Sequence, residues 1–135
     1  MTNLNFSISE LCKSDKAKQN GIKNTPTISI VDNMLELIVY CLQPVRDYLK
    51  KPMIITSGFR CPELNKLVCG VANSQHLEGK AADFIIKGES VASIIFKIQT
   101  SNLEYDQLIH EKISGKEWVH ISFNKGHNRR KYLKL

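Results

Sequence analysis

Two histidines and one aspartate are the residues of this chain best suited by type to hold a metal ion. His76 and Asp83 lie in the short segment Ser74–Asp83, and His120 follows later in the chain. Two imidazoles and one carboxylate suit a catalytic zinc ion, because three protein ligands leave the fourth tetrahedral position for water. Gly79 allows the chain to turn tightly between His76 and Asp83. We therefore expect His76, Asp83 and His120 to form a zinc site with one open position.

The strand expected around His120 decides which side chains accompany it. Alternation along a strand places Trp118 and Ser122 on the face of His120, so that this face can line a cleft while the other enters the core. Glu117 precedes His120 by three residues and would lie on the opposite face of a regular strand. It reaches a metal-bound water only if the strand begins with a bulge, or if Glu117 belongs to the preceding loop.

The remaining elements follow from caps, breakers and hydrophobic periodicity. A capping box at Ser7–Glu10 and a glycine at position 21 predict a first helix over residues 8–20. A second, amphipathic helix runs over about residues 30–49, with a kink or break expected at Pro44. Shorter helices are expected at 62–68 and 90–100, and strands at 53–56, 80–86, 105–110 and 118–123. This order predicts an α+β fold, a small antiparallel sheet with helices packed on it.

Composition and charge set limits on size and partners. The chain has 135 residues, 42% of them hydrophobic, which predicts a single domain over residues 1–135. A net charge of +6 favours polyanions, which include nucleic acid, anionic lipid and the phosphate-rich polymers of a bacterial wall. The basic residues of segment 124–135 are expected to form a solvated surface segment rather than a nucleic-acid-binding arm.

Hydrophobic stretches and cysteines bear on the compartment. The longest unbroken apolar stretch is the six residues Leu37 to Leu42, so no membrane insertion is expected. The first twenty residues lack the pattern of a secretory signal, so we expect synthesis in the cytoplasm, with action at the bacterial cell wall only after release. The four cysteines favour buried, reduced thiols over a redox pair such as Cys61 with Cys69.

Three motifs together resemble a known family. They are Ser-x-His-x-x-Gly-x-Ala-x-Asp at residues 74–83, Glu-x-x-His at 117–120 and Ser-Gly-Phe-Arg-Cys-Pro-Glu-Leu-Asn at 57–65. The chain is similar to the zinc D-Ala-D-Ala carboxypeptidases and related peptidoglycan peptidases, which share their fold with the amino-terminal signalling domain of hedgehog proteins. The resemblance implies zinc ligands at His76, Asp83 and His120 and a catalytic base at Glu117. It also implies that Arg60 holds a substrate carbonyl or carboxylate, and a guanidinium there would help to stabilise the oxyanion. From the residues themselves, Trp118 is expected to form a wall of the substrate cleft, and Ser74 either to hydrogen-bond in the active site or to stabilise the loop.

The resemblance implies a zinc-dependent peptidase that acts on stem peptides or cross-links of peptidoglycan, as a carboxypeptidase or an endopeptidase. Because no export signal is expected, release at the cell wall as a phage lysin is the simplest context. A non-catalytic, zinc-containing binding module of the same fold is the alternative, and Glu117 and Arg60 argue against it because a pure binder needs no base. A basic nucleic-acid-binding domain is a third, less favoured reading.

Overall fold

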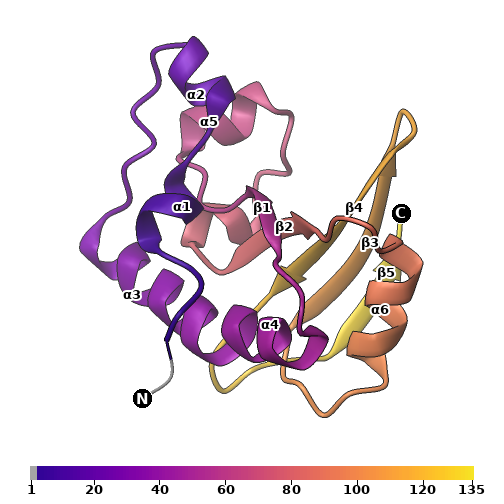
Figure 1. Ribbon diagram of the computed structural model, residues 1–135. Helices are drawn as coiled ribbons and strands as arrows, with labels where there is room; N and C mark the ends of the chain where they lie inside the picture. The colour runs from indigo at the N-terminus through magenta and orange to yellow at the C-terminus, as the bar shows by residue number, and fades with distance from the viewer. Residues whose placement is uncertain (1–2) are drawn as a thin grey trace.

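The computed structural model describes residues 3–135 and contains a five-stranded sheet in the order β1-β2-β4-β3-β5 (Figure 1). The strands are β1 (Ile54–Ser57), β2 (Ala81–Ile85), β3 (Gln107–Ile113), β4 (Lys116–Ser122) and β5 (Lys131–Lys134). The helices are α1 (Ile8–Cys12), α2 (Asp15–Gln19), α3 (Ile28–Leu37), the π-helical η1 (Ile38–Leu42), α4 (Gln43–Leu49), α5 (Pro62–Leu67), the 3-10 helix η2 (Gln75–Glu78) and α6 (Val91–Gln99). The expected α+β fold is confirmed.

The register of the central strands determines which residues share a face. Strands β2 and β4 are antiparallel, with Asp83 directly opposite His120. Strands β3 and β4 form an antiparallel hairpin in which Glu111 lies opposite Trp118. Directly opposed residues project from the same face of a sheet. Because Trp118 and His120 are two residues apart, all four of these side chains project from one face.

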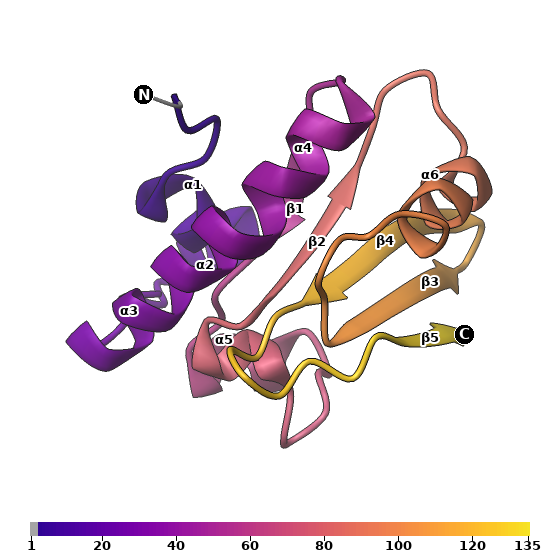
Figure 2. The same cartoon turned by 90° about the horizontal axis from the view of Figure 1, so that it is seen from below.

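The other face of the sheet forms the hydrophobic core. Helices α3 to α4 and helix α6 supply one side of this core, and the sheet supplies the other. Figure 2 shows α6 lying against the β3–β4 part of the sheet and α4 near β1 and β2. The fully buried side chains from the strands and these helices include Phe84, Leu108, Val119, Ile121, Met34, Leu37, Leu42, Val45, Ile94 and Ile98.

The segment Ile28–Leu49 is a continuous helical run. Of the kink or break expected at Pro44, the break does not occur. Instead, the turn before the proline widens into the π-helix η1. The backbone N–H of Gln43 donates to the carbonyl of Ile38, five residues earlier. Proline has no N–H and crowds the previous turn, and a π-turn is one way for a helix to accommodate such a disturbance. By length and composition this segment could also span a membrane, a test that the buried core helix of a soluble protein passes equally.

The first predicted helix is in fact two short helices. Helix α1 ends at Cys12, and Lys13 has an extended conformation. Ser14 then caps α2, its hydroxyl accepting a hydrogen bond from the N–H of Ala17. The prediction of one helix over 8–20 was wrong because Ser14 is a second N-cap inside the predicted range.

The basic C-terminal segment is largely exposed, as expected, but it also contributes a strand. Strand β5 pairs with β3 in parallel, with Tyr132 opposite Leu108. The other neighbouring strands of the sheet are antiparallel. Strand β5 therefore covers the edge of β3 that would otherwise be unpaired.

Candidate active site

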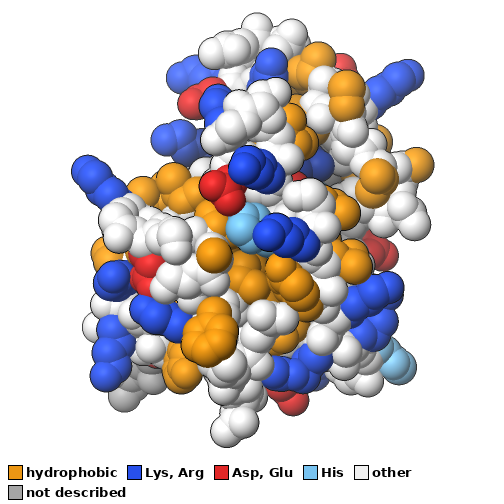
Figure 3. Space-filling view, turned by 90° about the vertical axis from the view of Figure 1, so that its right-hand side faces the viewer, with side chains coloured by type: hydrophobic (Ala, Val, Ile, Leu, Met, Phe, Trp, Pro, Cys, Tyr) orange, Lys and Arg blue, Asp and Glu red, His pale blue; other side chains and the backbone are white. Residues whose placement is uncertain are grey.

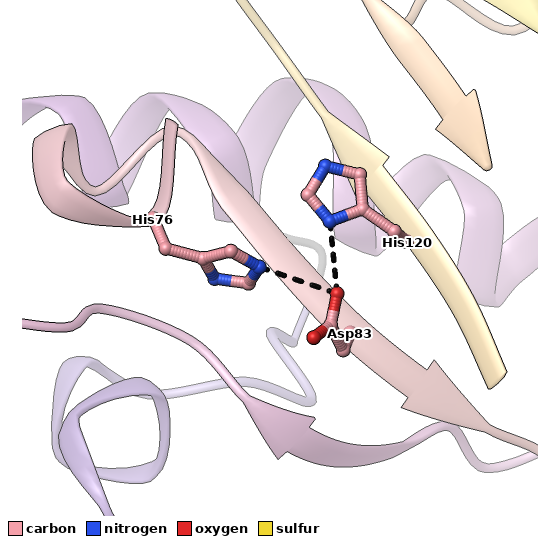
Figure 4. Close-up of side chains that lie close together, drawn as sticks. All are labelled: His76, Asp83 and His120. Atoms are coloured by element: carbon pink, nitrogen blue, oxygen red, sulfur yellow. Dashed lines mark hydrogen bonds and ion pairs between the residues drawn. The ribbon is translucent and has the colours of Figure 1, made fainter. Parts of the chain in front are cut away.

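Three side chains from three separate elements converge on one point (Figure 4). His76 comes from η2, Asp83 from β2 and His120 from β4. The Nε2 atom of His76 lies 3.2 Å from Oδ1 of Asp83, and Nδ1 of His120 lies 2.9 Å from the same oxygen. One ligand atom from each residue lies within 4.8 Å of the other two, and all three residues are buried. The structure therefore brings together the three residues expected to bind metal.

The hydrogen bonds of His76 test whether this cluster fits a cation. Its Nδ1 lies 2.7 Å from the carbonyl oxygen of Gly58, an acceptor, so we assign the proton to Nδ1. The Nε2 lone pair then faces the Asp83 carboxylate, and two lone pairs in contact repel unless a proton or a cation lies between them. In metal-binding histidines, the ring nitrogen that does not bind the metal usually donates its N–H to such an acceptor, which fixes the tautomer. The donor set fits a metal ion of the zinc type.

The electrostatics of Asp83 agree with a site built for positive charge. Burial alone would raise the pKa of Asp83, but the neighbouring His76 and His120 outweigh it and hold that pKa well below its usual range. Asp83 is therefore ionised at neutral pH. An ionised carboxylate in a buried position needs a cationic partner to offset its desolvation.

The loop that carries His76 is fixed by close backbone packing. Ser74 caps η2, accepting from the N–H of His76 at 3.2 Å. Gly79 ends η2 with φ of +71°, and an added Cβ there would come within 2.6 Å of Met34 in α3. The chain before β2 can therefore turn back only with glycine at this position.

Arg60 lies beside the three clustered side chains and is held in place by three partners. It donates from Nε to Ser57 and from Nη1 to Asn65, and its Nη2 lies 3.5 Å from Oδ2 of Asp83. An added Cβ at Gly70 would come within 2.0 Å of the Asn65 side chain and 2.9 Å of Arg60. Asn65 is buried and was not singled out from the sequence, although it belongs to the motif at residues 57–65.

The structure does not bring Glu117 to this cluster. Strand β4 is regular from Lys116 onward, so the bulge that Glu117 would need is not there. Glu117 projects from the face opposite His120, and its carboxylate lies 2.6 Å from Nε2 of His110. That hydrogen bond lowers the pKa of Glu117, which is partly exposed to solvent. The expected position of Glu117 beside the metal is therefore corrected.

A different carboxylate, Glu111, occupies the cleft face. It lies opposite Trp118 on β3 and lines the same cleft as His76 and His120. Burial raises the pKa of Glu111 and the charge of Asp83 raises it further, while His120, His76 and Arg60 act in the opposite sense. The pairing with Trp118, two residues before His120, places Glu111 on the face that carries the cluster. The sequence did contain a signal for this residue. Glu111 directly follows the strand predicted at 105–110, and alternation places its side chain on the face of Ile109, opposite to that of His110.

The cluster opens into a cleft of about 1160 Å³. Ser74 and Trp118, both expected at the site, line it, as does Arg60. Two buried polar atoms of cleft residues, Nε1 of Trp118 and Oε1 of Gln75, have no hydrogen-bond partner within residues 3–135. Buried polar atoms are seldom left unpaired, so these two fit groups that a ligand would satisfy. Figure 3 shows one face of the molecule on which a histidine lies beside acidic and basic side chains, above a group of hydrophobic ones.

The four cysteines are all free, as expected, so Cys61 and Cys69 do not form a disulfide. The expectation that they are mostly buried was wrong: Cys12 and Cys61 are half-buried and Cys69 is exposed. Cys41 is fully buried in the core, and burial strongly raises the pKa of its thiol. This thiol stays protonated and acts as a small hydrophobic group.

Comparison with known proteins agrees with the geometry. A family model described as Peptidase M15 matches residues 4–122, which include the three clustered ligands, Arg60 and Glu111. No curated protein matches the chain. The match covers most of the chain, including the clustered side chains, and the chain belongs to peptidase family M15, a family of zinc-dependent metallopeptidases.

Proposed function

We propose that this metallopeptidase hydrolyses peptide bonds in the stem peptides or cross-links of peptidoglycan, with zinc held by His76, Asp83 and His120. The observation that carries the proposal is the convergence of three buried ligand atoms at the floor of an open cleft. When bound, zinc supplies a Lewis acid that makes water nucleophilic near neutral pH and polarises a carbonyl group.

Glu111 is proposed as the general base, in place of Glu117. It projects from the cleft face of the sheet, and its raised pKa lies closer to neutral pH than that of an exposed glutamate. A base works best when its pKa approaches the working pH. In the ionised form, Glu111 accepts a proton from the attacking water and returns it to the leaving amine.

Arg60 and Trp118 are proposed to contact the substrate. Arg60 presents a fixed guanidinium beside Asp83, which suits the developing oxyanion or a terminal carboxylate. Trp118 offers a buried N–H donor without a partner in the described part of the chain, which suits a substrate carbonyl. Ser74 is proposed to support the loop and to hydrogen-bond near the substrate.

The biological context proposed is attack on the bacterial cell wall by a single domain spanning residues 1–135, with a phage lysin as the simplest case. The net charge of +6 favours approach to anionic wall polymers. Nucleic acid is not proposed as a partner.

The proposal is tested on defined muropeptides, with products identified by mass spectrometry. The purified protein is depleted of metal with a chelator and then reloaded with zinc. We expect cleavage to be lost on depletion and restored by zinc, and the masses of the products to identify the bond. The variant Asp83→Asn, which removes the charged ligand, should bind zinc far more weakly and lose cleavage. Tight zinc binding by the wild type without any cleavage would support the non-catalytic module instead.

A further inference from the structure

The C-terminal segment 124–135, which we call the tail, forms one wall of the cleft. The family match ends at residue 122, before the tail begins. The segment between β4 and β5 lines the cleft together with residues 68–71, which follow α5, and with the loop that carries His76. The tail residues that do so are Asn124, His127, Asn128, Arg129 and Leu135. The substrate cleft is therefore bounded in part by residues outside the matched region.

Within the tail, Arg129 is held by a buried carboxylate. Its Nε and Nη2 atoms each lie 2.9 Å from an oxygen of Asp106, and its backbone N–H donates to Asp106 at 3.0 Å. Asp106 is 1% exposed. Hydrogen bonds from Arg129 hold the pKa of Asp106 at about 2 although burial opposes this, so Asp106 is ionised at neutral pH. A bidentate contact of this kind fixes the plane of the guanidinium group.

The opposite edge of the same guanidinium remains free. The Arg129 side chain is 55% exposed and lines the cleft. A guanidinium has five N–H donors, and two of them are used by Asp106. Within residues 3–135, no acceptor contacts the other three. A planar, prefixed pair of donors matches the two oxygens of a carboxylate.

Asp106 also connects this position to the metal ligands. Its Oδ2 accepts a hydrogen bond from Nε2 of Gln75 at 2.9 Å, and Gln75 immediately precedes His76. One buried carboxylate therefore positions both the Arg129 side chain and the loop that carries a metal ligand. The fold therefore fixes the distance along the cleft between the Arg129 guanidinium and the loop that carries His76.

We propose that Arg129 binds a carboxylate group of the peptide substrate, at a subsite that the tail adds to the cleft. This inference rests on the proposed peptidase function and specifies a part of its substrate. Because Asp106 already balances the charge of Arg129, recognition depends on the geometry of the donors more than on net charge. A lysine, which has no such fork, is therefore expected to be a poor replacement.

The test uses three synthetic peptides and the zinc-loaded protein. The first is L-Ala-γ-D-Glu-L-Lys-D-Ala-D-Ala; in the other two, the carboxyl group of D-Glu or the C-terminal carboxyl group is an amide. We expect the wild type to cleave one amide roughly tenfold or more less efficiently than the free acid, mainly through KM, because that amide loses a charge-assisted hydrogen bond. In Arg129→Ala and Arg129→Lys, this preference should fall to within about twofold.

The neighbouring Arg130 provides the matched control. It stacks on Tyr105 with its guanidinium 4.7 Å from the ring, and it donates to the carbonyls of Leu103 and Ser101. Arg130 does not line the cleft. Arg130→Ala should therefore keep the preference for the free acid, even if it loosens the tail and lowers activity on all three peptides alike.

The outcomes separate the subsite from the proposed function. If the wild type cleaves all three peptides equally well, the subsite is refuted while the peptidase function stands. If Arg129→Ala keeps the wild-type preference, the carboxylate is bound elsewhere and the inference is also refuted. If no variant and no wild-type protein cleaves any peptide, the proposed function fails and the inference fails with it.

Discussion

The two faces of the β3–β4 hairpin each carry a glutamate and a histidine, and they use them differently. On the cleft face, Glu111 and His120 lie near Asp83 at the floor of an open cleft. On the other face, Glu117 lies 2.6 Å from His110 and forms a closed pair with it. The residue types are the same, so the types alone do not identify a catalytic site. The cleft face has a third charged group, Asp83, and it opens into the cleft. These two features distinguish it from the other face.

The largest difference should appear when Glu111→Gln is compared with Glu117→Gln. Glu111→Gln is expected to lower kcat about 10²-fold to 10⁴-fold, because the general base is lost while the size of the side chain is kept. Glu117→Gln is expected to leave kcat within about twofold, because Glu117 lies on the far face of the sheet. Rates are compared on the muropeptide that the wild type cleaves, at saturating zinc. A large loss for Glu117→Gln with a small one for Glu111→Gln would reverse the assignment of the two faces.

A smaller contrast is expected between two adjacent residues of β4. Trp118→Phe keeps the ring but removes the N–H, and should lower kcat/KM roughly tenfold with little change in stability. Val119 is fully buried on the core face, so Val119→Ala should instead cost roughly 1–3 kcal/mol of unfolding free energy with kcat unchanged. Denaturant unfolding and steady-state kinetics on both variants measure the contrast. Equal effects of both changes on kcat/KM would mean that the faces are not functionally distinct.

The smallest effect concerns the pH dependence of stability. The hydrogen bond from His110 lowers the pKa of Glu117 below its ordinary value of about 4.5. The folded state therefore gains stability above that value and loses the gain as the pH falls through the lowered pKa. Wild type should be slightly more stable than Glu117→Gln at pH 6, and the difference should shrink as the pH falls below about 4.5. Unfolding by denaturant is followed with a chelator present; a difference that does not shrink at low pH would mean that the ionised Glu117 carboxylate is not its source.

The convergence of His76, Asp83 and His120 could be predicted from the sequence, because two motifs of fixed spacing contain them. His76 and Asp83 lie on either side of a single tight turn, so their separation in the chain limits their separation in space. The long apolar helix and the central strands were likewise predictable from periodicity. Their boundaries differ by a few residues from those expected, which is usual where helices and strands end.

The proposed base and the tail could not be predicted in the same way, for physical reasons. Glu117 was expected to be the base from the Glu-x-x-His motif and the family resemblance, whereas Glu111 reaches the cleft through the pairing of β3 with β4, which the chain order alone does not specify. Strand β5 is four residues long and contains two lysines, so it has little hydrophobic alternation to detect. Its position is given by pairing with β3, and the residues just before it are held by the long-range contact between Asp106 and Arg129.

The widened turn at Ile38–Leu42 explains how one helix can support two distant parts of the molecule. The apolar residues Ile30, Met34, Ile38, Cys41, Val45 and Leu49 form five intervals over 19 residues, one residue more than five turns of an ideal α-helix. In a uniform α-helix that surplus would rotate the last of them by about 100° relative to the first. The π-turn accommodates this extra residue. The amino-terminal half of the helix therefore packs against Gly79, behind the loop that carries His76, while the carboxyl-terminal half packs against α6.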